Sequence, residues 1–302
     1  MKWIKKGLIF NANQQVPHLI SYATVPIAEK IDNSIYRIYF SSRDETNHSH
    51  TFFIEIDIHN PKKIIRISEK PILSPGKLGS FDDSGAMASW IVNVNQKKYL
   101  YYIGWNERVT IPYHNSIGLA ISSDNGKTFK KYADGPIVDR TPNEPYFSAS
   151  CCSLIENNVW KLWYLSCKNW LHYNGNARPN YHIKYAESDD GINWKRNGHV
   201  SIDFKNDEEW AISRPSIIKE NGLYKMWYSF SGDLSYRIGY AESQDGKNWK
   251  RMDDLVGITI SSSGWDSQSI EYPFVFEHDR TKYMLYCGNE FGKTGFGYAI
   301  ME

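Results

Sequence analysis

Residues 185–194 read YAESDDGINW, and this stretch recurs as YAESQDGKNW at 240–249 and more loosely as LAISSDNGKTF at 119–129. Each copy holds an Asp-Gly or Asn-Gly pair, which supplies the positive φ angles of a tight hairpin turn. Every copy therefore predicts a strand, a turn and a second strand. We expect the acidic residues of these copies to stabilise the turn and not to catalyse a reaction.

A second hairpin precedes each copy. Pro215 leads residues 215–218 into a turn and then into the aromatic run YKMWY at 224–228. The same arrangement joins 26–28 to 35–40, 89–92 to 99–102, 151–155 to 160–164 and 273–276 to 283–286. Five units of four strands, repeated radially, predict an all-β fold, a five-bladed β-propeller. The expected blades cover approximately residues 18–65, 82–139, 146–203, 208–258 and 264–302.

The two ends of the chain are expected to meet. The last predicted blade stops at residues 298–300, one strand short, and the N-terminal strand 3–10 is free to complete it. Such closure removes an open sheet edge, which would otherwise promote aggregation. No helical pattern of useful length and no Pro- or Ser-rich linker interrupts the sequence, so residues 1–302 are expected to form a single domain.

Charge and hydropathy exclude several classes of protein. The formal net charge is +1, from 35 Lys and Arg against 34 Asp and Glu, and without a basic excess we expect no binding to nucleic acid. No apolar run approaches the ~18 residues that cross a bilayer, so no membrane contact is expected. The apolar stretch near the N-terminus, residues 7–10, is shorter than a secretory signal requires. These features predict a cytoplasmic protein.

The cysteines and histidines lack the spacing of metal sites. Cys151, Cys152, Cys167 and Cys287 form no CxxC pair. The sequence therefore predicts buried free thiols, and neither a metal nor a cofactor.

The Pro-led inner strand, the aromatic second strand and the Asp-Gly hairpin together resemble the five-bladed β-propeller glycosidases. This group includes arabinanases, β-xylosidases, fructosidases and β-mannoside phosphorylases. The resemblance covers nearly the whole chain, although its motifs are mostly structural. It implies a carbohydrate-active enzyme that cleaves or transfers a glycosidic bond, acting as a glycosidase or a phosphorylase. The implied substrate is a small molecule or oligosaccharide, an intracellular glycan or activated sugar. The chain is also similar to proteins associated with surface-polysaccharide biosynthesis.

In that family the catalytic carboxylates stand just before the Pro-led segments. The best match is Glu271, which stands two residues before Pro273 and predicts the general acid. The equivalent positions of the other four expected blades hold no carboxylate, so the family's set of three is not reproduced. Asp83 is the second catalytic candidate, a base or stabiliser. Unlike Asp82, which the repeat aligns with Asp266 and Glu208, Asp83 has no repeat partner.

Polar and aromatic residues near the same face are candidates for binding substrate. Arg214 directly precedes Pro215 on a central strand, and a buried Arg requires an anion: a substrate phosphate or carboxylate, or a neighbour such as Glu271 or Asp83. Two long loops, 104–115 and 169–182, carry side chains suited to sugar rings and hydroxyls. With phosphate in place of water, Arg214 and Lys293 could bind it. The predicted binding residues are Arg214, Trp105, Asn106, His182, Tyr236, Tyr272, Asn289 and Lys293.

Two other classes of protein stay open. The missing carboxylates favour a non-catalytic propeller that binds a glycan or a nucleotide sugar. A protein-interaction platform would instead expose broad apolar patches and lack a polar funnel. The enzyme hypothesis predicts that Asp83, Arg214 and Glu271 point into one central cavity, with Trp105 and His182 nearer its rim.

Overall fold

The computed structural model describes residues 1–12, 16–232 and 235–302. This part of the chain is built from strands β1 to β20, with one short 3₁₀ turn, η1 (Asp253–Leu255), and one short helix, α1 (Asn289–Gly292). The all-β prediction is confirmed. No helix in the described part is long and apolar enough to cross a membrane. The four cysteines are free and buried, as predicted.

The strands pair antiparallel in chain order, as meanders of four. The predicted blade ranges enclose them, except that β5 ends two residues beyond the first range. In order, the meanders are β2 (Ser21–Lys30), β3 (Ile35–Arg43), β4 (Ser49–Asp57) and β5 (Ile64–Ile67); β6 (Gly85–Val94), β7 (Lys97–Glu107), β8 (Tyr113–Ser122) and β9 (Lys130–Lys131); β10 (Ser148–Glu156), β11 (Val159–Tyr173), β12 (Asn176–Ser188) and β13 (Val200–Ile202); β14 (Ala211–Glu220), β15 (Leu223–Ser231), β16 (Arg237–Ser243) and β17 (Lys250–Arg251); and β18 (Glu271–His278), β19 (Thr281–Cys287) and β20 (Phe296–Met301), with β1 (Trp3–Phe10) at the outer edge.

Two single parallel pairs join neighbouring meanders, Ser49 with Gly85 and Tyr181 with Ala211. The described strands therefore form two eight-stranded sheets and one four-stranded sheet, instead of five separate ones. Gly85 permits the first junction, because a Cβ atom there would lie 2.8 Å from the Cβ of Ser49.

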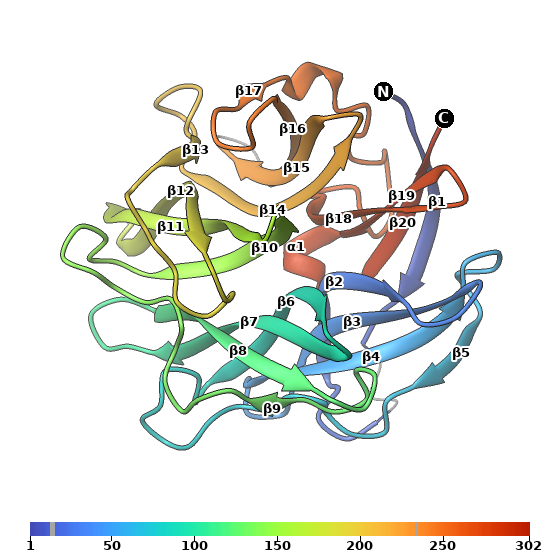
Figure 1. The fold of residues 1–302 in the computed structure, drawn as a ribbon, viewed down its shortest axis with the longest axis horizontal. Helices are drawn as coiled ribbons and strands as arrows, with labels where there is room; N and C mark the ends of the chain where they lie inside the picture. The colour runs from blue at the N-terminus through green and yellow to red at the C-terminus, as the bar shows by residue number, and fades with distance from the viewer. Residues whose placement is uncertain (13–15, 233–234) are drawn as a thin grey trace.

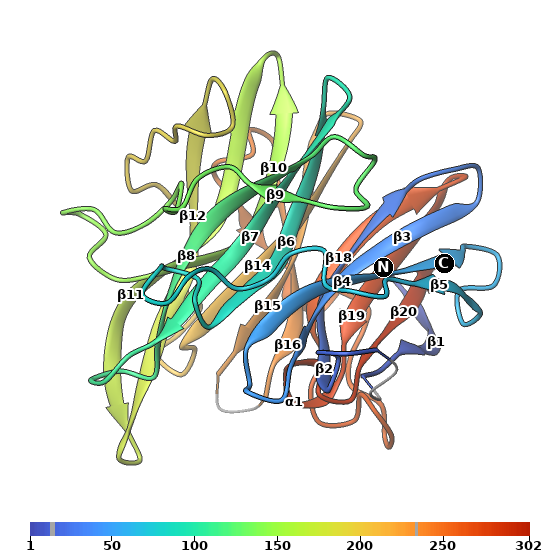
Figure 2. The same ribbon diagram turned by 90° about the horizontal axis from the view of Figure 1, so that it is seen from below.

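The first strand of each meander lies nearest the centre (Figure 1). Strands β2, β6, β10, β14 and β18 contact one another in this order, and β18 contacts β2 in turn. The β11–β12 hairpin projects beyond the other strands on the side where α1 lies (Figure 2). This face carries the pocket described below.

The N-terminal strand belongs to the last sheet. β1 pairs antiparallel with β20, from Trp3 opposite Met301 to Phe10 opposite Phe296. Trp3 packs edge-on against Trp227, with ring centroids 6.0 Å apart. This pairing gives β20 a neighbour that the last three strands alone would not supply.

The repeated Asp-Gly segment forms the expected turn. Gly191 has a φ of 74°, and the Asp190 carboxylate accepts hydrogen bonds from the backbone amides of Ile192 and Asn193, each at 2.8 Å. These bonds hold the pKa of Asp190 well below its usual range. The structural interpretation of these acidic residues is confirmed.

Candidate functional site: an aromatic pocket at the centre of the strands

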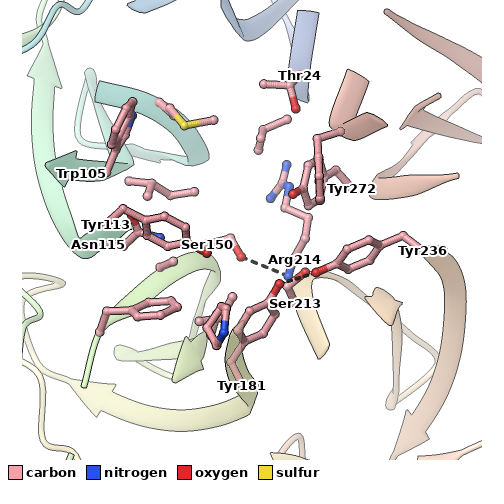
Figure 3. A pocket seen from close by; sticks show the side chains of 18 of the residues that line it. Thr24, Trp105, Tyr113, Asn115, Ser150, Tyr181, Ser213, Arg214, Tyr236 and Tyr272 are labelled. Carbon is pink, nitrogen blue, oxygen red and sulfur yellow. Dashed lines mark hydrogen bonds between the residues drawn. The ribbon is translucent and has the colours of Figure 1, made fainter. Parts of the chain in front are cut away.

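A cavity of about 370 Å³ opens where the central strands meet. This volume is within the range of small-molecule sites. Trp105, Tyr113, Tyr181, Tyr236 and Tyr272 stand around it (Figure 3). Three arginines also line it, Arg43, Arg178 and Arg214, whereas no Asp or Glu of the described chain does. The lining is thus aromatic and cationic.

Arg214 lies in the innermost wall and is fully buried. Its Nη1 donates to the carbonyl of Ser89 at 2.7 Å, and its Nη2 donates to that of Pro26 at 3.2 Å. Its backbone amide donates to Ser150 Oγ at 3.0 Å. One residue of β14 therefore contacts the first strands of three other meanders, β2, β6 and β10.

The guanidinium of Arg214 is a buried cation without an ion-pair partner among the described residues. Its Nε has no hydrogen-bond acceptor there, and two bonds to carbonyls leave most of its five N–H donors free. Burial lowers the pKa of Arg214 to about 10, which still keeps it charged at neutral pH. A buried charge is stabilised by an opposite charge, so the geometry favours an anion beside it.

The backbone is strained at the same level of three central strands. Val25, Arg214 and Tyr272 have φ values of 53°, 53° and 55°. Each directly precedes a proline and lines the cavity. The left-handed region is unfavourable for non-glycine residues and most of all for β-branched Val. Strain of this kind concentrates at functional sites.

Glu271 lies directly behind the lining. Its side chain is 1% exposed. Its Oε1 accepts hydrogen bonds from the Phe291 amide at 2.8 Å and from Ser269 Oγ at 3.3 Å, while Oε2 is buried without a partner. Burial raises the pKa of Glu271 to about 8. Its carboxyl group is therefore mostly protonated at neutral pH and is next to two lining residues, Tyr272 and Phe291.

Four predicted binding residues line the cavity together: Trp105, Arg214, Tyr236 and Tyr272. The hydroxyl of Tyr236 is hydrogen-bonded to that of Tyr181, and both tyrosines are buried. At the rim, the Arg43 guanidinium lies 4.6 Å from the Tyr22 ring and 6.0 Å from the Trp105 ring.

The other predicted residues lie outside the lining. Asn106 donates to the Ser80 carbonyl at 3.4 Å, and His182 Nδ1 is 3.0 Å from Asp203 Oδ1. Asn289 Oδ1 accepts the backbone amides of Gln268 and Ser269. Lys293 is exposed and pairs with Glu290 at 2.9 Å.

Asp83 is also separate from the cavity. Its carboxylate accepts the Gly79 amide at 2.8 Å and the Ser84 hydroxyl at 3.1 Å. The expectation that it shares a cavity with Arg214 is not met, because short-range donors in its own loop hold its side chain there.

Sequence reasoning missed lining residues such as Arg43 and Trp210, for which no motif gave a signal. Three more, Tyr113, Arg178 and Tyr181, belong to the long segments 104–115 and 169–182 that the sequence did indicate, although they were not among the predicted binding residues. Among the described residues, the one group with metal-ligand geometry lies outside this pocket, at the edge of the first meander.

No protein-family model matches the sequence. The uncharacterized protein Rv1502 of Mycobacterium tuberculosis (strain ATCC 25618 / H37Rv) is 37% identical over 302 residues, which cover all of both chains. The chain belongs to the same family as this mycobacterial protein. It is also 29% identical over 147 residues to a beta-1,2-mannobiose phosphorylase of Thermoanaerobacter sp. (strain X514), covering 45% of this chain and 48% of that protein.

Solved structures of glycoside hydrolases have the same fold. One titled a glycoside hydrolase superposes with a TM-score of 0.75 at 17% identity, covering 98% of this chain and 91% of the other. A glycosyl hydrolase from Bacteroides ovatus gives 0.73 at 13% identity, covering 100% and 93%. At these identities the likeness shows the fold alone, which is that of the propeller glycosidases.

Proposed function

We propose that this chain is a carbohydrate-active enzyme that transfers a glycosyl group to inorganic phosphate, as a phosphorylase does. One observation carries the proposal: the pocket has three arginines and no carboxylate in its described lining, and directly behind it lies the buried carboxyl group of Glu271, whose pKa burial raises to about 8. Hydrolysis by the usual route requires two carboxylates at the scissile bond. An anionic nucleophile held by arginine removes the need for the second carboxylate.

The residues divide into three roles. The aromatic lining, which includes Trp105 and Tyr272, offers flat apolar faces on which sugar rings can stack. Arg214 binds phosphate through its free N–H donors, with the fork geometry that suits a phosphate group. Glu271 is the general acid. Its access to the substrate requires a shift of the turn at Phe291, whose side chain is 47% exposed.

The reaction balances with these groups alone. A phosphate oxygen attacks the anomeric carbon as the bond from that carbon to the leaving sugar oxygen breaks. Glu271 donates its proton to that oxygen, and the proton of the incoming hydrogen phosphate restores the acid. The products are a sugar phosphate and a free sugar hydroxyl. General acid catalysis of this kind typically contributes about 10²–10⁴ in rate.

The proposal extends to the architecture and the setting. We take the five meanders as five blades, closed by β1, within a single domain of residues 1–302. A cytoplasmic location and an intracellular glycan or activated sugar agree with phosphate as co-substrate. In this proposal five predicted residues do not contact the substrate and instead support the loops in or beside which they lie: Asp83, Asn106, His182, Asn289 and Lys293.

A second candidate function is binding without catalysis, to a glycan or a nucleotide sugar. The burial of Glu271 favours it, since a carboxyl group that is 1% exposed does not reach a ligand without movement of the Phe291 turn.

Phosphorolysis can be tested directly. The protein is incubated with a panel of disaccharides with and without inorganic phosphate, and sugar phosphate is detected by ³¹P NMR. We expect product only with phosphate, and a loss of about 10²–10⁴ in rate in Glu271→Gln. Glu277→Gln, whose side chain is about half exposed on the same strand, is the matched control. Saturable saccharide binding without turnover would instead favour the binding protein.

A further inference from the structure

Two histidines and an aspartate meet at the edge of the first meander, outside the pocket. His18 lies just before β2, Asp44 follows β3 and His50 lies in β4. One side-chain ligand atom from each lies within 4.8 Å of the other two. His50 Nε2 and Asp44 Oδ2 are already 3.0 Å apart.

The aspartate and the buried histidine are held in place by other groups. Asp44 Oδ1 accepts the backbone amides of Thr46 and His48, each at 2.9 Å, which leaves Oδ2 facing His50. The other ring nitrogen of His50, Nδ1, lies 3.1 Å from Ser74 Oγ. An outer partner of this kind orients a metal-binding imidazole and selects its tautomer.

His18 supplies the movable third group. Its φ is 63°, an uncommon value for a non-glycine residue. Its ring stacks on that of His50, with centroids 5.4 Å apart and an angle of 19° between the planes. Its Nδ1 is 3.7 Å from Glu45 Oε2, and both side chains are well exposed. The ligand atoms of two imidazoles and one carboxylate therefore lie close together, and a second carboxylate, that of Glu45, lies beside His18.

We propose that His18, Asp44 and His50 form a binding site for a divalent transition-metal ion, with Zn²⁺ as the best match and Glu45 as fourth ligand. Imidazole nitrogen with carboxylate oxygen suits zinc, whereas Ca²⁺ and Mg²⁺ prefer oxygen alone. Bonds of about 2.0–2.1 Å place the ligand atoms of a tetrahedral site roughly 3.3 Å apart. His50 and Asp44 meet this spacing, and a rotation of the exposed His18 ring completes it.

The site would join the segment before β2 to the β3–β4 turn. Arg43, the residue before Asp44, lies over the rings of Tyr22 and Trp105, which line the pocket. A metal here orders one side of the pocket rim. The ion takes no part in the proposed reaction, so the two proposals stand or fall separately.

The test is metal binding by the full chain, without any activity assay. Chelator-treated protein is titrated with Co²⁺, which absorbs visible light when four-coordinate, and with Zn²⁺ by calorimetry. The variants are His18→Ala, Asp44→Asn, His50→Gln and Ser74→Ala. His172→Ala is the matched control, because His172 lies in the β11–β12 hairpin, away from the cluster. Circular dichroism checks that each variant is folded.

We expect one equivalent of either metal to bind the wild-type protein, and Zn²⁺ to raise its Tm. Ser74→Ala removes an outer partner of His50, and such a loss usually weakens metal affinity about 10–100-fold. His18→Ala and Asp44→Asn each remove a ligand, so they should weaken binding more. His172→Ala should bind normally. Absence of saturable binding, or equal binding in His18→Ala, Asp44→Asn and His172→Ala, overturns the site. His50→Gln keeps the comparison valid should Asp44→Asn fail to fold.

Discussion

Replacing Arg214 with methionine distinguishes two roles of this residue, anion binding and structural support of the central strands. Arg214 links four central strands, because its guanidinium donates to the carbonyls of Ser89 and Pro26 and its backbone amide donates to Ser150 Oγ. The backbone bond to Ser150 survives in the variant, while the two carbonyl acceptors lose their partners. The substitution therefore has two opposing effects on stability and one on ligand binding.

The two effects on stability oppose each other. The fall in the pKa of Arg214 from its ordinary value to about 10 corresponds to about 3 kcal/mol of unfavourable burial, and the apolar side chain removes it. Two buried carbonyls left unpaired cost about 1–3 kcal/mol each. The net change in the free energy of unfolding is then a loss of about 3 kcal/mol at most, or a gain of about 1 kcal/mol.

The effect on anion binding is larger and has one sign. Removing one partner of a buried charge pair costs about 2–5 kcal/mol, which weakens phosphate binding roughly 30-fold to 4,000-fold. Calorimetry with inorganic phosphate measures the affinity, and urea denaturation measures stability. Arg214→Lys keeps the charge but loses the fork, so its affinity should be intermediate. Unchanged phosphate affinity in Arg214→Met, with a clear loss of stability, would refute the reasoning and leave Arg214 a brace.

Three further predictions concern the acid, the turns and the N-terminal strand. The folded pKa of Glu271, about 8, lies above its ordinary 4.5, so this residue contributes stability that is complete below pH 4.5 and is lost as the pH rises through 8. Urea denaturation should therefore show wild-type protein losing up to about 5 kcal/mol relative to Glu271→Gln over this interval; parallel pH profiles would contradict the shift. Gly191→Ala should destabilise more than Gly198→Ala, although both glycines have positive φ, because a Cβ at 191 would lie 2.7 Å from the Trp160 ring and one at 198 meets nothing within 4 Å; equal melting temperatures would argue against packing at this turn. Deleting residues 1–10 removes β1 and exposes the edge of β20, so size-exclusion chromatography should reveal aggregation; a monomer with an unchanged Tm would show that β1 is dispensable.

The sequence predicts the strands well because their signals are local. Turn pairs such as Asp190-Gly191 fix each hairpin within a few residues, and the repeat carries this information around the chain. The prolines that follow Arg214 and Tyr272 likewise identified two central strands from neighbouring residues, and both Arg214 and Tyr272 line the pocket. Local sequence therefore predicts the position of a residue along its strand.

The sequence predicts much less about the partners of polar side chains. Asp83 and Asn289 accept hydrogen bonds from backbone amides, and His182 pairs with Asp203. No sequence motif predicts these interactions. The repeat aligned Glu208 with the buried Asp82, yet Glu208 is exposed and its neighbour Glu209 forms the buried pair with Arg251. The buried acidic residue therefore lies one position further along the chain than the repeat predicted. A loop tolerates such a shift, whereas in a strand it would turn every side chain to the opposite face. The His18, Asp44 and His50 cluster was missed because it joins three separate segments.

One backbone position in the central strands places a single charge in the innermost wall of the pocket. All five strands have a register irregularity at the same level. The residues there are Val25, Ser89, Ser150, Arg214 and Tyr272. Four of these side chains are neutral, so the net charge of the set is that of one guanidinium. The acid directly behind the lining, Glu271, is kept mostly neutral by its burial. A ligand that neutralises this centre must bring its own negative charge, and this is the charge argument behind the proposed phosphate co-substrate.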